Sequence, residues 1–380
     1  MGFDYPIPHC FMREYKMEKT YKYRIYPNRK QKTQIQKTFG CVRFVYNYYL
    51  NKRIEEYKKN GILFNFYMCS KDLTRLKKEL IWLKDPDKDA LQKALKDLDF
   101  AYKDFFKKVK GYPKFKSKKE KYQSYRTNCS NNNIRFVNKH IKLPKLGFVK
   151  IRDKRVPSGR ILNATISQEP DGHYYCALCC TDISFNLLPQ TNLNVGIDLG
   201  ITNFAIFSNG EKIENPHFYE NSELKIATLQ RKLSRKTIGS KRWEKNRVKI
   251  AKIQKHIANQ RKDFLQKLTT KLIKTYDVIA IEDLNVKAMQ ETKIKTRNKR
   301  VFDVSWASFR KMLIYKATWY GKRVIVINRY YPSTQICHCC GHRDEKKPEN
   351  IKFWTCPKCN ANLDRDVNAA INILNEALKT

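Results

Sequence analysis

Acidic residues are scarce in this sequence relative to basic ones. The 380-residue chain has 36 Asp and Glu residues but 78 Lys and Arg residues, which gives a formal net charge of +42. A surface so positive repels itself unless a polyanion neutralises it, so we expect long RNA or DNA as a partner, bound with salt-sensitive affinity. A charge excess that serves only solubility is the alternative, and the size of the excess argues against it. With 41% hydrophobic and 12% aromatic residues, the chain is not a disordered basic tail.

Long apolar runs and several common catalytic signatures are missing as well. No run approaches the roughly 18 residues of a membrane-spanning helix, and residues 1–16 mix acid, base and proline, unlike a signal peptide. We therefore expect no membrane partner and a reducing compartment, in which the 12 cysteines favour metal binding over disulfides. The sequence has no Walker loop and no nucleophile elbow, and its seven histidines form no metal-binding cluster.

The first half of the chain predicts a β-rich domain that is interrupted by helices. Residues 21–27 alternate like a strand, and Asn28 can cap the helix that follows. A second helix is expected over 89–109, before a basic connector at 111–121. Short segments of strand character then fill residues 124–186, which is typical of a small β-barrel or sandwich. The N-terminal strand could complete that sheet, and the helices would then form an insertion.

The second half alternates strands and helices after a boundary at 186–192. Two strands precede a long helical stretch over 221–276, which combines an apolar stripe with rows of Lys and Arg. Cations of one sign at i,i+4 repel each other unless an anion lies alongside, so we expect this stretch to contact nucleic acid. A solvated helix face is the alternative. The remaining expected elements are a strand at 278–282, a helix at 303–320, a strand at 323–328 and a helix from about 365.

Three acidic residues stand at the ends of these elements. Asp198 ends an apolar run in NVGIDLG, Glu282 ends the run in YDVIAIE, and Asp366 opens the last helix. In an RNase H-like fold, two adjacent central strands bring their ends together and the final helix points its first turn at them. Three carboxylates so placed can bridge two Mg²⁺ ions, one activating a water and the other stabilising the leaving 3′ oxygen of a phosphodiester. The pattern predicts a metal-dependent nuclease with these acids as catalytic residues and magnesium ligands.

Each acid has a competing explanation. Asp198 could cap a turn, Asp283 could replace Glu282, and Asp364 could cap the last helix. We favour Asp366 over Asp364 because the helical phase places Asp366 toward the sheet, whereas Asp364 precedes the helix. The segment GIDLG also begins the phosphate loop of actin-like ATPases and sugar kinases. That class needs a second glycine-rich loop, which this sequence lacks, and it would not explain the charge.

Two cysteine pairs have the spacing of a zinc ribbon. Each pair is a C-x-x-C, 15 residues separate the pairs, and four thiolates leave no open position, so the expected role of Zn²⁺ is structural. The predicted ligands are Cys337, Cys340, Cys356 and Cys359. His338 and Cys339 lie between the ligands and could in principle substitute. Cys176, Cys179 and Cys180 have no partner pair, so we interpret them as core thiols.

Ordered blocks from about residue 20 to the end resemble the TnpB family, insertion-sequence proteins related to type V CRISPR effector nucleases. The blocks include YRIYPN, GCVRFVYNYYL, ALQKALKDLDFAYKDFF, GIDLGITNFA, YPSTQICHCCG, WTCPKC and DRDVNAAINI. The resemblance implies a multidomain α+β fold, in which a wedge-type β-barrel holds an inserted helical recognition domain. An RNase H-like (RuvC) α/β nuclease domain with a zinc-ribbon insertion would follow. The family's acidic triad and zinc ligands fall on the same three acids and four cysteines.

The resemblance also implies domain boundaries and DNA-contacting positions. The expected segments are an N-terminal extension at 1–16, the barrel with its N-terminal helix at 17–50 and 122–190, the recognition domain at 51–121, and the nuclease domain at 191–380 with its zinc ribbon at 331–362. The family reads a DNA motif through the recognition helices and barrel, and the matching polar positions are Lys88, Gln92 and Thr127. Two departures affect local turn geometry: Asn360 stands where Gly is usual and Leu363 where His is common.

The activity that this resemblance implies is that of an RNA-guided DNA endonuclease of a transposable element. Its partners would be a transposon-derived guide RNA, with one protein monomer per RNA, and target double-stranded DNA cut beside a short transposon-adjacent motif. Its cofactors would be Mg²⁺ for catalysis and Zn²⁺ for structure, while base pairing would carry target specificity. Such a protein would be cytoplasmic in a prokaryote and nucleoid-associated when bound to DNA. The alternatives are a guided repressor that binds without cutting and a zinc-ribbon DNA-binding regulator that needs no RNA.

Overall fold

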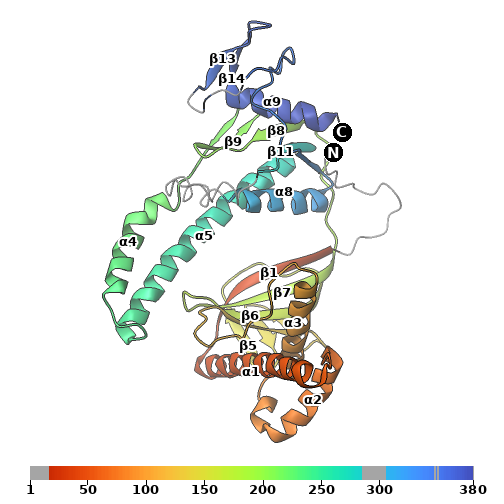
Figure 1. Ribbon diagram of the computed structural model, residues 1–380, viewed down its shortest axis with the longest axis vertical. Helices are drawn as coiled ribbons and strands as arrows, with labels where there is room; N and C mark the ends of the chain where they lie inside the picture. Colours follow the sequence, from red (N-terminus) through yellow and green to blue (C-terminus); the bar gives the residue numbers. More distant parts are fainter. Residues whose placement is uncertain (1–16, 285–304, 346–347, 349–350, 380) are drawn as a thin grey trace. The chain divides into compact units, whose positions relative to one another are not determined.

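The computed structural model describes residues 17–284, 305–345, 348 and 351–379. Their contacts divide the chain into an N-terminal unit that ends at Ser184 and a C-terminal unit that begins at Phe185. Figure 1 shows the elements of both units. None of the described helices is both long and apolar enough to span a membrane. The expected N-terminal extension, residues 1–16, lies outside the described residues.

A seven-stranded antiparallel sheet forms the core of the N-terminal unit. Its strands are β1 (Met17–Tyr26), β2 (Gln123–Asn128), β3 (Arg135–Val137), β4 (His140–Leu143), β5 (Gly147–Ile151), β6 (Arg160–Gln168) and β7 (Tyr174–Ile183). They lie in the order β2-β6-β7-β1-β5-β4-β3, so the N-terminal strand pairs with strands that follow the helices in sequence, as predicted. The described strand pairs leave β2 and β3 as edges and do not close the sheet into a barrel.

Helix α1 (Arg29–Asn60) begins and ends where local sequence signals place its ends. Asn28 accepts a hydrogen bond from the backbone N–H of Gln31, whose side chain accepts one from the N–H of Asn28, forming a capping box. Gly61 follows the helix in the left-handed conformation, with φ 64°, which glycine adopts at little cost. The apolar positions that recur at helical spacing along α1 are buried: Ile35, Phe39, Val42, Val45, Tyr46 and Tyr49. Since α1 runs unbroken through residue 50, the domain boundary expected there falls inside a helix.

Two further helices accompany α1 in the N-terminal unit. They are α2 (Phe66–Glu79) and α3 (Lys88–Phe106), joined through the short 3₁₀ helix η1 (Ile81–Lys84). Helix α3 corresponds to the helix predicted at 89–109 and buries Leu91, Leu95 and Leu98, which recur at helical spacing. Helix α3 contacts both α1 and strand β2, so it packs between α1 and this edge of the sheet.

A five-stranded mixed sheet forms the centre of the C-terminal unit. Its strands are β8 (Asn194–Asp198), β9 (Asn203–Phe207), β10 (Lys212–Glu214), β11 (Val278–Glu282) and β12 (Arg323–Ile327). They lie in the order β10-β9-β8-β11-β12. Strands β8, β11 and β12 are parallel to one another, β9 is antiparallel to β8, and β10 is antiparallel to β9. The two strands that end in Asp198 and Glu282 are therefore direct neighbours.

Helices cover both faces of this sheet. On one face, α5 (Lys241–Thr275) and α8 (Trp306–Tyr320) enclose an apolar core that includes Ile279 and Ile281 of β11. On the other face, α9 (Arg365–Leu378) packs against Val278 and Ala280 of the same strand. Figure 1 shows these helices around strands β8, β9 and β11. Alternate residues of β11 thus enter two cores, as expected for a strand that is buried on both sides.

The helical stretch predicted at 221–276 is not one helix, and the prediction is wrong in this respect. It consists of α4 (Glu220–Ser234) and α5, which pack against each other as a hairpin (Figure 1). Gly239 adopts a left-handed φ of 85° in the connection, and the Ser240 side chain accepts a hydrogen bond from the N–H of Trp243 to cap α5. The serine in TIGSKRW is therefore the local signal that begins α5, and the glycine lies in the connection that follows the end of α4 at Ser234.

Candidate active site and zinc site

Asp198 and Glu282 end two neighbouring parallel strands of the C-terminal unit. Strand β8 stops at Asp198 and β11 stops at Glu282. The register pairs Ile197 with Ile281, so the acids that follow them lie beside each other at the carboxyl edge of the sheet. This edge is where open α/β sheets place their ligand sites.

Helix α9 brings the third predicted acid to this edge. Asp366 lies in the first turn of α9, which packs against β8 so closely that a Cβ on Gly196 would meet the carbonyl oxygen of Ala370 at 2.0 Å. Only glycine permits this approach, and it places the start of α9 next to the end of β8. The three predicted acids thus come from separate elements that share one edge of one sheet.

Burial and mutual repulsion act on the pKa values of the acids at this edge. Burial raises the pKa of Asp198 well above its usual range, and the carboxylates of Glu282 and Asp366 raise it further, while Arg365 opposes them. Burial also raises the pKa of Glu282, against the hydrogen bond of 2.7 Å that its Oε1 accepts from the Ser333 hydroxyl. Arg365 pairs with Asp366 at 3.3 Å, but three carboxylates still gather at this edge and repel one another, so the edge favours a further cation or a proton.

Two other acids, Asp364 and Asp283, lie close in sequence to Asp366 and Glu282 but have partners of their own. Asp364 accepts hydrogen bonds from the N–H groups of Asp366 and Val367 as the N-cap of α9, and pairs with Lys212 at 2.5 Å. Burial alone would raise the pKa of Asp364, but Lys212 and the two N–H groups hold it below its usual range. The sequence alternative in which Asp364 caps the helix is therefore correct.

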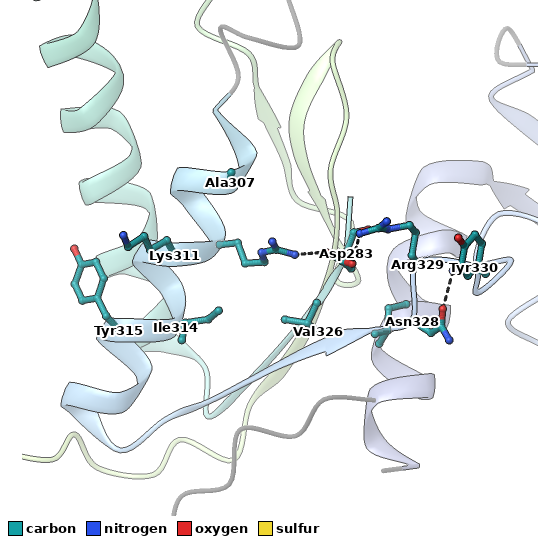
Figure 2. A pocket seen from close by; sticks show the side chains of 11 residues that line it. Asp283, Ala307, Lys311, Ile314, Tyr315, Val326, Asn328, Arg329 and Tyr330 are labelled. Atoms are coloured by element: carbon teal, nitrogen blue, oxygen red, sulfur yellow. Dashed lines mark hydrogen bonds and ion pairs between the residues drawn. The ribbon is translucent and has the colours of Figure 1, made fainter. Parts of the chain in front are cut away.

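Asp283 is likewise held by cations. Its carboxylate pairs with Arg310 of α8 and with Arg329, which follows β12. Figure 2 shows Asp283 between these elements. Burial would raise the pKa of Asp283, but the two guanidinium groups lower it. Asp283 is thus neutralised by two arginines, whereas its neighbour Glu282 faces the other carboxylates.

A cavity of about 890 Å³ opens at the ends of β11 and β12, where Asp283 lines it. Its wall carries three cations, Arg310, Lys311 and Arg329, against the single carboxylate of Asp283. Tyr330 lies on the same wall with 85% of its surface exposed (Figure 2). No local sequence pattern indicates this cavity, because its lining comes from α8, from the end of β11 and from β12 with the segment after it.

The four predicted zinc ligands come together in a small module of the C-terminal unit. Their sulfur atoms all lie within 4.8 Å of one another, including distances of 3.7 Å from Cys337 to Cys359 and 3.6 Å from Cys340 to Cys356. The hairpin β13 (Phe353–Thr355) and β14 (Asn362–Asp364) holds the second pair and leads directly into α9. A tetrahedral Zn²⁺ fits a cluster of four thiols, and the prediction of a four-cysteine cluster is confirmed.

The two departures from the family pattern fit this module. Gly341 and Asn360 each follow the second cysteine of a pair, and both adopt left-handed conformations, with φ of 71° and 57°. Asparagine tolerates this conformation better than other non-glycine residues, so Asn360 can replace glycine. Leu363 is buried against Trp354 in a small apolar cluster that also contains two of the ligand cysteines. The module therefore has its own core.

Two of the three cysteines of strand β7 are core thiols as expected, whereas the interpretation is wrong for Cys179, which is only half-buried. Cys176 and Cys180 are fully buried, and burial raises the pKa of Cys176 to about 12 and that of Cys180 to about 11. Cys179 points to the other side of the strand, where it lies 3.8 Å from the Glu18 carboxylate. Thiols with raised pKa values are poor metal ligands and nucleophiles.

The proposed DNA-contacting residues lie together in the N-terminal unit. Lys88 and Gln92 are four residues apart on α3, and Gln92 accepts a hydrogen bond of 3.1 Å from Ser70 of α2. Thr127 of β2 is buried, with 1% of its surface exposed, and its hydroxyl donates to Asp87 at the start of α3. Lys88 and Gln92 thus lie in the first turns of α3, and Thr127 is hydrogen-bonded to the residue that precedes this helix. Lys88 is exposed, whereas Thr127 is buried.

Sequence models of known families match three parts of the chain. A model described as “Probable transposase” (OrfB_IS605) matches residues 179–293, and one described as “Cas12f1-like, TNB domain” matches 306–373. A third, described as “Helix-turn-helix domain”, matches 17–61. In the structure, residues 17–61 form the strand β1 and the single helix α1, so that description does not fit them.

Relatives of nearly full length decide the family. A protein of Streptomyces pristinaespiralis, provisionally named an RNA-guided DNA endonuclease, is 37% identical over 363 residues, which cover 94% of this chain and 89% of the relative. Further relatives are named TnpB-like. The chain belongs to the TnpB family. A second TnpB relative, InsQ of Escherichia coli strain K12, has the same provisional name and is 32% identical over 369 residues, or 93% of this chain and 91% of InsQ.

A solved structure shares the fold of this TnpB protein. The protein chain in a cryo-EM structure of a Cas12f1–sgRNA–target DNA complex superimposes with a TM-score of 0.61, covering 94% of this chain and 98% of that one. The two sequences are only 13% identical, so the likeness concerns the fold alone. This TnpB protein therefore has a Cas12f-like fold of mixed α/β content with a four-cysteine cluster.

Proposed function

We propose that this TnpB protein is an RNA-guided DNA endonuclease that cuts guide-matched DNA beside a transposon-adjacent motif. The observation that carries the proposal is the meeting of Asp198, Glu282 and Asp366 at one sheet edge, where the pKa of Asp198 is raised. The provisional names of its full-length relatives support the same activity. In this proposal the C-terminal unit is a RuvC-type nuclease domain. The N-terminal unit, whose described strands form an open sheet, is the wedge-type domain with an inserted recognition domain.

Magnesium ions fit the donor set at this edge. Carboxylate oxygens are the hard ligands that Mg²⁺ prefers, and the mutual repulsion of the three acids would be relieved by a cation. Asp198, Glu282 and Asp366 would hold the ions. When bound, two ions would activate the attacking water and stabilise charge on the leaving 3′ oxygen. The role of the chain itself is to hold the three acids in place from β8, β11 and the first turn of α9.

The cavity at the ends of β11 and β12, which Asp283 lines, suits the backbone of the strand that is cut. Arg310, Lys311 and Arg329 supply positive charge, which the phosphates of a DNA strand would neutralise. The exposed ring of Tyr330 offers a face on which an unpaired base could stack. Asp283 holds both arginines at the wall, so it orients cations for the substrate and does not coordinate metal.

A single experiment separates this proposal from its rivals. The protein is purified with its bound RNA, the RNA is sequenced, and DNA that matches the guide segment is offered in Mg²⁺ beside a randomised flanking motif. We expect cutting of matched DNA by the natural protein and none by Asp198→Ala, which should bind RNA nearly as well. Guided binding without cutting by the natural protein would establish a repressor. DNA binding that needs no RNA would establish a zinc-ribbon regulator.

We also propose that Lys88, Gln92 and Thr127 contribute to reading the adjacent motif. Lys88 is exposed at the start of α3, whereas Thr127 must release Asp87 before it can contact DNA. Gln92→Ala should change the motif that is recovered from a randomised library, and Lys103→Ala, at the far end of α3, should not. If alanine variants of Lys88, Gln92 and Thr127 all recover the same motif as the natural protein, this assignment is refuted. We propose that the protein is cytoplasmic and that the complex contains one protein monomer per RNA. The mass of the purified complex tests this stoichiometry.

A further inference from the structure

Three buried polar side chains connect the zinc module to Glu282. Ser333, Asn368 and Asn372 expose 4%, 1% and 3% of their surfaces. Ser333 lies in the segment between β12 and the first cysteine pair, and the two asparagines lie on α9. Asparagine is a poor helix former and costly to bury, so two of them four residues apart on the inner face of a helix need a specific reason.

The hydrogen bonds supply that reason. Asn372 Nδ2 donates to the carbonyl oxygen of Ser333 at 2.9 Å and to that of Ile336 at 2.6 Å. Asn368 Nδ2 also donates to Ile336, at 2.7 Å, and its Oδ1 accepts from the backbone N–H of His338 at 2.9 Å. Ile336 and His338 flank the zinc ligand Cys337. Helix α9 therefore fixes the backbone that enters the zinc module.

The same backbone carries the hydroxyl that reaches the carboxylate site. Ser333 Oγ donates to Glu282 Oε1 at 2.7 Å, while the Ser333 carbonyl is held by Asn372. Helix α9 also bears Asp366 in its first turn. One helix thus positions two of the three carboxylates, Asp366 directly and Glu282 through Ser333, and it anchors the first zinc knuckle with the same pair of asparagines.

We propose that Ser333, Asn368 and Asn372 are positioning residues that hold the Glu282 carboxylate and make its placement depend on the zinc module. A buried network in which every member is satisfied is rigid, and outer partners of this kind fix the orientation of metal-binding carboxylates. The inference rests on the proposed role of Glu282 as a metal ligand. It assigns the zinc module a function beyond folding, because its first knuckle sets the position of Ser333.

Replacement of Ser333 gives the most direct test. Ser333→Ala should lower the single-turnover cleavage rate of the protein–RNA complex by about ten- to a hundredfold with little change in DNA affinity, whereas Ser333→Thr keeps the hydroxyl and should restore most of the rate. Thr334→Ala, which removes the neighbouring hydroxyl, is the matched control and should cut normally. A wild-type rate in Ser333→Ala, or equal losses in the alanine and threonine variants, would overturn the proposal.

A measurement without cleavage separates this inference from the proposed function. Calorimetric titration of the protein–RNA complex with Mn²⁺, in the absence of DNA, should show weaker binding for Ser333→Ala by a similar factor and unchanged binding for Thr334→Ala. If the natural protein does not cut DNA, the proposed function fails, while the Mn²⁺ titration still decides whether Ser333 positions a metal ligand. Unchanged Mn²⁺ affinity in Ser333→Ala would end the inference even if the protein cuts.

The dependence on the zinc module is tested at Asn372. Asn372→Ala should slow cleavage as Ser333→Ala does while retaining zinc, and Asn375→Ala, on the exposed side of the same helix, should change neither. If Asn372→Ala retains its zinc and cuts DNA at the full rate, the placement of Glu282 does not depend on the zinc module. If Asn372→Ala does not fold, the Ser333 pair of variants still decides the proposal.

Discussion

The two clusters of potential metal ligands in the C-terminal unit are assembled in opposite ways. The four cysteines come from residues 337–359, on two local turns and one short hairpin. The three acids come from β8, β11 and α9, which meet only when the five-stranded sheet and its covering helices have formed. The first cluster needs local geometry alone. The second depends on the whole unit, so it is the more sensitive to distant changes.

The two clusters also differ in how the protein manages their charge. The zinc cluster has its own small core, and the backbone N–H of Gly341 and that of Asn360 donate to the carbonyls of Cys337 and Cys356 at 2.9 Å. The acidic cluster gathers like charges, and Arg365 and a backbone hydrogen bond from Leu199 oppose the rise in the pKa of Asp198 without reversing it. The cysteine cluster thus serves stability, while the acidic cluster holds an unfavourable arrangement that a bound cation would relieve.

The largest expected effect concerns the two adjacent acids at the end of β11. Glu282→Gln should reduce cleavage of guide-matched DNA roughly a thousandfold or more, since the neutral amide removes one of the three proposed metal ligands. Asp283→Asn is the matched control, because Asp283 is paired with two arginines, and it should lose far less activity. Both are measured as single-turnover rates at saturating protein–RNA complex. If Asp283→Asn were the more severe, the assignment of the two acids would be reversed.

Loss of the zinc site should have the next largest effect, on stability. Cys356→Ser or zinc chelation should destabilise the C-terminal unit by several kcal/mol, because structural zinc contributes folding free energy directly. Thermal unfolding and metal analysis give the readout. Cys339→Ser is the control, since Cys339 is exposed and lies outside the four-thiol cluster. A melting curve that does not change when zinc is removed would contradict a structural role.

A smaller effect of opposite sign is expected at Asp198. The folded-state pKa of this acid is raised, so its ionised form disfavours the fold at neutral pH, and the difference disappears as pH falls below the range in which Asp ionises. Asp198→Asn should therefore raise the free energy of unfolding at pH 7 by something on the order of 1 kcal/mol in buffer without Mg²⁺. Urea unfolding at pH 7 and at low pH measures it. A destabilised variant at pH 7 would refute this interpretation of the site.

The smallest effect concerns the cap of α9. Asp364→Asn keeps a capping oxygen but loses the pair with Lys212, so it should cost at most about 1 kcal/mol at pH 7. Since the folded-state pKa of Asp364 is lowered, its contribution is complete above the usual range of Asp and is lost as pH falls below about 4. Urea unfolding across pH detects this loss. Asp263→Asn, which breaks an exposed pair with Lys267, should show almost none.

Sequence reasoning was successful where a feature depends on neighbours along the chain. The Asn28 cap of α1, the two cysteine pairs and the strand ends at Asp198 and Glu282 all follow from short patterns. It failed at 221–276, where the apolar and basic periodicity continues through a connection and hides the break at Gly239. Periodicity reports which face is buried, and it does so equally well for one long helix and for two consecutive ones.

Other features could not be found because their partners come from distant segments. The Ser333 bond to Glu282 spans 51 residues, and the asparagines that hold the Ser333 backbone lie still further along the chain. The only local sign of this network was a pair of asparagines within an otherwise apolar helix face at 368 and 372. Such residues indicate that a buried partner exists, but the sequence does not say which backbone supplies it.

The sequence by itself determined the basic surface, the four thiol ligands and a short set of candidate acids. Only the tertiary structure showed that Asp283, the neighbour of Glu282, is paired with two arginines, and that Asp364 is the helix cap. In both cases cations on other elements hold the acid: Arg310 and Arg329 pair with Asp283, and Lys212 pairs with Asp364. Acids that are close along the chain are nearly equivalent in the sequence, and they become different when folding gives each of them its own partners.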